Sequence, residues 1–137
     1  MIRIPQHCSS GDLNDLQKFI VDLEPVQRQV SYWLVRIEEC VGPGSYAFAE
    51  LTEQCARLSH LAFASLCYCI DQVIDGKFIA YLADREIARL RAIDSTFWEI
   101  TGSTELERVM LSKYGAYVES FDISNFGIRS GMRPIDE

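Results

Sequence analysis

The sequence predicts a mostly helical single domain, a bundle built around one antiparallel pair of long helices. Apolar residues recur at spacings of three and four over residues 13–41 and again over 47–73, which is the period of a helix with one buried face. Gly42, Pro43 and Gly44 separate the two stretches, and long helices joined by a short turn pack antiparallel. The length of 137 residues suits one domain, so 1–137 is expected to fold as a unit.

The first long helix is expected to follow an irregular lead-in over residues 1–9. Ser10 is a suitable N-cap, with Asp12 in the first turn. Pro25 interrupts the apolar stripe, and a proline beyond the first turn of a helix costs about 3 kcal/mol. The stretch is therefore either one kinked helix or two helices that meet near Glu24. The unbroken phase of the stripe favours the kink.

The second long helix is centred on residues 58–70, a run without a formally charged residue. Because polar residues are sparse on every face of this run, it is predicted to be buried nearly all round and to form the spine of the fold. Asp75 and Gly76 are expected to end the helix.

The remaining elements are predicted to be shorter. A third helical segment begins at residue 78 and continues to 93, while residues 95–101 fit either a short strand or a helical turn. Thr104 with Glu107 matches a capping box and begins an amphipathic helix that reaches Phe121. Residues 122–137 are expected to form an irregular tail. A short strand pair between 96–101 and 119–124 is an open alternative.

The composition argues against two classes of partner. The net charge of −7 is unsuited to nucleic acid and to anionic membranes, both of which require a basic face. The apolar run is shorter than the roughly 20 residues that a membrane helix needs. Five cysteines form no regular framework, and the start of the chain has no apolar signal region. We therefore expect reduced thiols in a cytoplasmic protein.

The residues best suited to chemistry do not form a recognisable site. Cys67 and Cys69 would point in different directions on a helix, and no second ligand pair follows them. Glu53, Arg57 and His60 would share one helix face, so His60 is either a general base positioned by Glu53 or a half-exposed histidine beside an ordinary ion pair. The second interpretation is favoured because no nucleophile lies at a fixed spacing. No catalytic residue, metal or cofactor is predicted.

One small basic cluster lies later in the chain. Arg85, Arg89 and Arg91 together are suited to binding a phosphate or an acidic partner. Acidic residues are interleaved with them, which favours a solvated face instead.

Acidic residues gather around the Gly-Pro-Gly turn and form the predicted partner-binding site. Glu38 and Glu39 would lie in the last turn of the first helix, where the helix dipole disfavours them by about 0.3–1 kcal/mol each. Glu50 and Glu53 would lie in the first turns of the second helix, where the dipole favours them. A broken local rule is a place to suspect function; the alternative is a solvated acidic tip. Further along, Tyr117 and Arg129 are residue types enriched at interfaces.

The leading functional hypothesis is a bacterial immunity protein, an inhibitor that neutralises a toxic enzyme by occluding its active site. Such a protein needs a rigid scaffold and an acidic patch complementary to a basic-surfaced partner. One alternative is a secretion chaperone or adaptor that acts as a dimer. Another is a small-ligand-binding or enzymatic helical domain that uses His60 or a cysteine. The partner is expected to be a protein, and the oligomeric state is left open.

Overall fold

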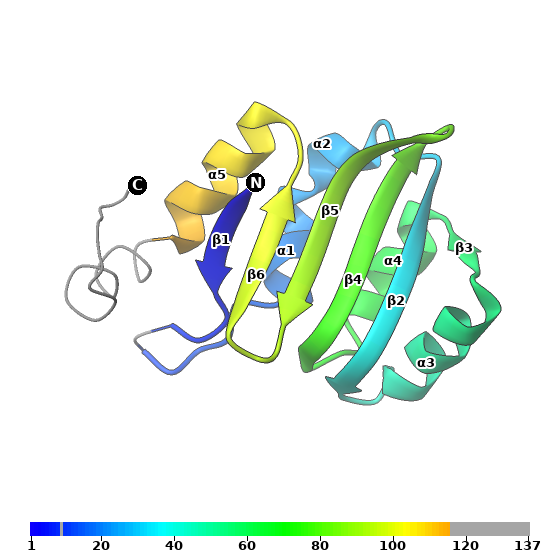
Figure 1. Ribbon diagram of the computed structural model, residues 1–137, viewed down its shortest axis with the longest axis horizontal. Helices are drawn as coiled ribbons and strands as arrows, with labels where there is room; N and C mark the ends of the chain where they lie inside the picture. The colour runs from blue at the N-terminus through cyan, green and yellow to red at the C-terminus, as the bar shows by residue number, and fades with distance from the viewer. Residues whose placement is uncertain (9, 116–137) are drawn as a thin grey trace.

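A computed structural model, in which residues 1–8 and 10–115 are described, consists of a six-stranded antiparallel sheet with helices packed on one face (Figure 1). The strands follow the order β1-β6-β5-β4-β2-β3, with every pairing antiparallel. Their bounds are β1 Ile2–Pro5, β2 Tyr32–Val41, β3 Arg57–Leu58, β4 Gln72–Leu82, β5 Arg85–Ile93 and β6 Phe97–Thr101. The helices are α1 Leu16–Asp22, α2 Glu24–Gln27, α3 Ser45–Gln54, α4 His60–Cys67 and α5 Thr104–Tyr114.

The predicted helical bundle and its all-α class are wrong, and β2 shows the reason. Trp33, Val35 and Ile37 are buried, while the residues between them are more exposed, which is the alternation of a half-buried strand. A stripe with spacings of three and four can be drawn through the same residues. The strand prevails because the segment is rich in β-branched and aromatic residues and pairs along its length with β4.

The predicted second long helix is also wrong, because the stretch forms α3, β3, α4 and β4 in turn. Within the run 58–70, Phe63, Cys67 and Ile70 are fully buried. Leu61 and Tyr68, in contrast, are 77% and 59% exposed. The run is therefore not buried all round, and only one side of α4 contributes to the core.

The interruption at Pro25 separates two helices and does not kink one. Pro25 lies in the first turn of α2, where its missing N–H costs little. Helix α1 ends at Asp22, and Leu23 lies between the two helices. Of the two alternatives drawn from the sequence, the favoured kink is wrong.

Of the elements predicted after residue 76, the third helical segment is wrong and the start of the last helix is confirmed. The expected third helical segment is the β4–β5 hairpin, and residues 97–101 form β6. Helix α5 begins where the capping motif predicts, although Ser103 is the N-cap and its Oγ accepts from Leu106 N at 3.1 Å. The strand proposed over 119–124 lies outside the described residues.

The Gly-Pro-Gly segment is a turn as predicted, but it follows a strand. Gly42 has a φ of +130°, and a Cβ at that position would lie 2.6 Å from Asp71 N. Gly44 N donates to Cys69 O at 2.7 Å. The segment thus requires glycine at residue 42 and ties the start of α3 to the end of α4.

The hydrophobic core lies between the sheet and the helices, chiefly α1, α4 and α5, and Phe48 of α3 also belongs to it. Trp98 and Phe78 from the sheet contact each other, and Phe19 of α1 meets Trp98 edge to face at 5.2 Å. Phe63 of α4 stacks on Trp33 at 4.1 Å. Among the described residues, none of the helices has the length and apolar character to cross a membrane.

Candidate functional site

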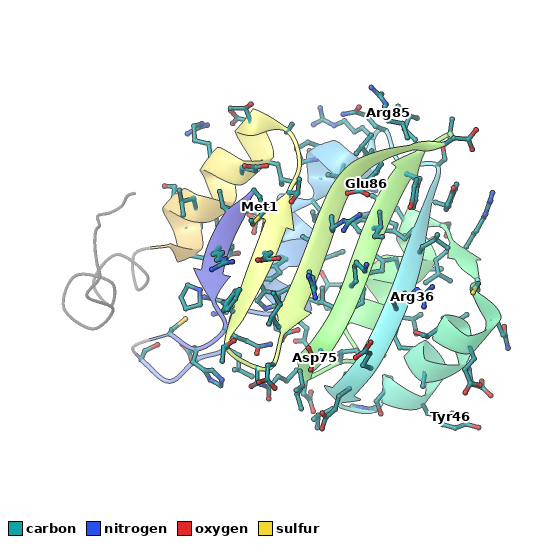
Figure 2. The ribbon with its side chains drawn as sticks, in the orientation of Figure 1. Met1, Arg36, Tyr46, Asp75, Arg85 and Glu86 are labelled. Carbon is teal, nitrogen blue, oxygen red and sulfur yellow. The ribbon has the colours of Figure 1, made fainter. Side chains whose placement is uncertain are left out.

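The sheet face turned away from the core presents its side chains toward the viewer in Figure 2. Ile79 of β4 identifies this face, because it is 9% exposed yet is not part of the core cluster. Its cross-strand neighbours are Arg89 of β5 and Leu34 of β2. The side chains of these neighbours therefore shield Ile79 from solvent. We call the sheet face that carries these three residues the open face.

A line of charged residues crosses the open face at right angles to the strands. The register pairs Arg3 with Glu99, Glu99 with Arg91, Arg91 with Lys77 and Lys77 with Arg36. Four of these five residues are cations, and we call Arg3, Arg36, Lys77 and Arg91 the basic row. Each belongs to a different strand.

The two ends of the basic row differ in how their charges are balanced. Glu99 forms an ion pair with Arg3 at 3.1 Å and lies 4.0 Å from Arg91. Lys77 and Arg36 take part in no ion pair within the described residues. Like charges directly opposite one another destabilise a sheet. The end of the row formed by Arg91, Lys77 and Arg36 therefore lowers the stability of the folded protein.

Aromatic rings on the open face are already in contact with neighbours. Tyr32 and Tyr81 stack at 5.1 Å with an interplanar angle of 17°. The guanidinium of Arg57 lies 4.3 Å from the ring centre of Tyr32, and that of Arg3 lies 4.7 Å from Phe97. These contacts hold the arginine side chains over the sheet.

The predicted acidic residues lie on two adjacent elements at one end of the sheet. Glu38 and Glu39 are exposed at a register shift in β2, where Glu39 stands opposite Asp75 of β4. Glu50 and Glu53 are exposed on α3. We call these five residues the acidic edge.

Helix α3 is fastened to the strand that carries Glu38 and Glu39. Thr52 Oγ1 accepts from Ile37 N at 2.9 Å and lies 3.4 Å from Val35 O. The Thr52 hydroxyl thus contacts the backbone groups of β2 that a neighbouring strand would otherwise bind. Glu53 and Glu38 directly follow these bonded residues, so the acidic residues of the strand and of the helix share one region.

The predicted helix-dipole effects on these glutamates are wrong. Glu38 and Glu39 lie in a strand, and Glu50 and Glu53 lie in the second half of α3 instead of its first turns. At that end of the helix the dipole disfavours Glu53. Tyr117 and Arg129, the other predicted partner-binding residues, lie outside the described residues.

A buried carboxylate that the sequence did not reveal joins the N-terminal segment to β4. Asp15 caps α1 and accepts from Leu16 N at 2.8 Å, from Val73 N at 3.0 Å and from Gln6 Nε2 at 3.1 Å. Burial raises the pKa of the Asp15 carboxyl to about 6, although the three hydrogen bonds act in the opposite direction. An aspartate before an apolar run was the available signal, but its depth depends on the tertiary fold.

The residues considered for chemistry are engaged in the fold. Glu53 and His60 lie on different helices, so the expected shared face does not form. His60 Nδ1 accepts from Trp33 Nε1 at 3.1 Å, and burial lowers the pKa of His60. Burial raises the pKa of the Cys67 thiol. No group of three or more potential metal ligands occurs within the described part of the chain.

The arginine cluster of the sequence is divided by the strand. Arg89 forms an ion pair with Glu86 at 2.7 Å, whereas Arg91 belongs to the basic row. Arg85 begins β5 opposite Leu82, so the three arginines do not converge on one point.

Comparison of the chain with protein-family models, with curated proteins and with solved structures finds no match.

Proposed function

We propose that this chain is a cytoplasmic immunity or inhibitor protein that occludes the basic active site of a toxic enzyme with its acidic edge. The observation that carries the proposal is the cross-strand pair of Glu39 and Asp75. Two carboxylates opposite each other disfavour folding, and a basic partner would relieve that repulsion. Such an arrangement is expected of a surface whose charge serves binding.

The rigidity of the acidic edge supports the same role. Strand β2 is hydrogen bonded to β4, and α3 is held against it through Thr52. An inhibitor benefits from this support because little conformational entropy is lost when a preorganised surface binds. The five cysteines are free thiols, which agrees with the proposed compartment.

The contacts of the candidate catalytic groups favour binding over catalysis. Asp15 is occupied by three donors from the protein itself. The His60 nitrogen that faces the core is occupied by the indole of Trp33. A general base needs reach to a substrate proton, and the Asp15 carboxylate and the Nδ1 atom of His60 instead accept hydrogen bonds from the protein itself.

Charge reversal tests the proposal. A variant with Glu38, Glu39, Glu50 and Glu53 changed to lysine is compared with the wild type in capturing a partner from the native cell. The matched control reverses four exposed carboxylates elsewhere, which are Asp12, Glu24, Asp84 and Glu105.

The expected result is a captured enzyme that the wild type and the control bind and inhibit, and that the acidic-edge variant neither binds nor inhibits. Equal capture by both variants would remove the acidic edge from the interface. A captured partner whose activity is unchanged by the bound protein would overturn the inhibitor role itself. Circular dichroism checks that both variants are folded.

A further inference from the structure

The basic row is unexpected on a chain of net charge −7. Three of its cations, Arg36, Lys77 and Arg91, occupy directly opposed positions on the adjacent strands β2, β4 and β5. In a protein with an excess of carboxylates, carboxylates could occupy these positions and pair with the cations. The unfavourable placement indicates a ligand that supplies the missing negative charge.

The spacing of these cations restricts the geometry of the ligand. Neighbouring strands lie about 4.8 Å apart, so the three residues present positive charge at that interval across the strands. Acidic residues on one face of a helix, three or four positions apart, are separated by about 5.3 Å along its axis. Alternate residues of an extended strand are about 6.7 Å apart. A helix laid across the strands therefore matches the row better than an extended segment.

The surroundings of the basic row favour a protein over a nucleic acid. Glu99 lies within the row, and Glu39 with Asp75 lies beside Arg36 and Lys77 on the same two strands. A continuous polyanion would meet these carboxylates, whereas a protein surface can alternate its charges.

The aromatic side chains of the open face also favour a protein partner over a nucleic acid. Recognition of single strands relies on free ring faces for base stacking. On the open face, Tyr32 is stacked on Tyr81 and has the guanidinium of Arg57 near its ring, while Arg3 lies over Phe97.

We infer that the basic row is a second interaction surface, which binds an acidic helix of a partner protein lying across β5, β4 and β2. Its glutamate or aspartate side chains pair with Arg91, Lys77 and Arg36. This surface adjoins the acidic edge and carries the opposite charge. The inference therefore stands without the proposed inhibitor function.

The probe is a cross-linked helical peptide of about 18 residues, or five turns, with glutamate on one face. Binding to the full chain is measured by fluorescence anisotropy at low salt. A peptide with glutamine in place of glutamate and a single-stranded DNA of equal charge serve as comparisons. The protein variants are Lys77→Gln with Arg91→Gln, and a control with Arg28→Gln and Arg108→Gln. The control removes one cation that directly follows α2 and one from α5.

The glutamate peptide is expected to bind, and the glutamine peptide is not. The Lys77 and Arg91 variant should weaken binding by about tenfold or more, corresponding to a loss of about 1.4 kcal/mol, while the control stays within about twofold of the wild type. Charge reversal of the acidic edge should not weaken binding, because it removes carboxylates that lie beside Arg36 and Lys77. This outcome separates the test from that of the inhibitor role.

Three results would overturn the inference. One is absence of peptide binding at millimolar concentration, and another is equal binding by the wild type and the Lys77 and Arg91 variant. The third is DNA binding as tight as that of the peptide with the same loss in the variant, which would reassign the surface to nucleic acid.

Discussion

Neutralising Lys77 should stabilise the folded protein. Lys77 stands between Arg91 and Arg36 and forms no ion pair within the described residues. Lys77→Gln removes both like-charge contacts and retains most of the side-chain stem. Lys77→Glu has nearly the same shape as the glutamine variant and turns both contacts into attractions, so the pair of variants isolates the effect of charge.

The size of the effect follows from the number of opposed pairs. Each cross-strand charge pair contributes about 0.2–1 kcal/mol, so removing two repulsive pairs should raise the free energy of unfolding by about 0.4–2 kcal/mol. For 137 residues the unfolding entropy is about 0.3 kcal/mol per kelvin. The midpoint of thermal unfolding should therefore rise by about 1–7 °C in Lys77→Gln, and by more in Lys77→Glu.

Thermal unfolding at low salt and at high salt provides the assay. The Debye length falls to about 3 Å at 1 M salt, so the difference between the glutamine and glutamate variants should nearly vanish there. Arg85→Gln is the control, because it removes one strand cation that stands opposite Leu82, and its midpoint should not rise. A Lys77→Gln midpoint at or below that of the wild type, or a gain that persists at high salt, would refute the electrostatic reasoning.

Three further predictions concern Asp15, His60 and Gly42. Between the ordinary pKa of Asp15, 3.8, and its folded pKa of about 6, the folded state keeps a proton that the unfolded state has released, so stability falls as pH rises. The loss of stability across this range is about 3 kcal/mol. The stability deficit of Asp15→Asn in urea unfolding should therefore shrink between pH 4 and pH 7, and a constant deficit would contradict this. Because burial lowers the pKa of His60, the unfolded state takes up a proton before the folded state does, and stability falls as pH drops below 6.5. His60→Gln should weaken this dependence of stability on pH. Tryptophan fluorescence during unfolding measures it. Gly42→Ala should lower the free energy of unfolding by about 2 kcal/mol or more, because strain at positive φ adds to a backbone clash. Gly11 has a φ of +93° with open space around a new Cβ, so Gly11→Ala should lower it by about 1–2 kcal/mol. Equal losses of stability in the two variants would rule out the clash.

Local features were readable from the sequence where their cause is local. The glycines at 42 and 44 predict a turn because few other residues tolerate that backbone and that close approach. The start of α5 is predicted to within one residue, because a serine or threonine side chain is well suited to accept hydrogen bonds from the first amides of a helix. The concentration of carboxylates between Glu38 and Asp75 is also a property of the sequence alone.

The choice between strand and helix was not readable, because the deciding partners are distant in the chain. Strand β2 is stabilised along its length by β4, and β1 by β6, whose residues follow about 95 positions later. An apolar pattern that fits both periods is resolved only when such a partner satisfies the backbone amides.

The two candidate surfaces illustrate the same division. The sequence by itself determined the acidic composition and the Gly-Pro-Gly turn, since these depend on residue type and immediate neighbours. Only the tertiary structure decided that Asp15 is buried, that Glu39 faces Asp75, and that cations from four strands form one row. Register across strands brings together residues that are far apart in the chain, and no local pattern encodes that juxtaposition.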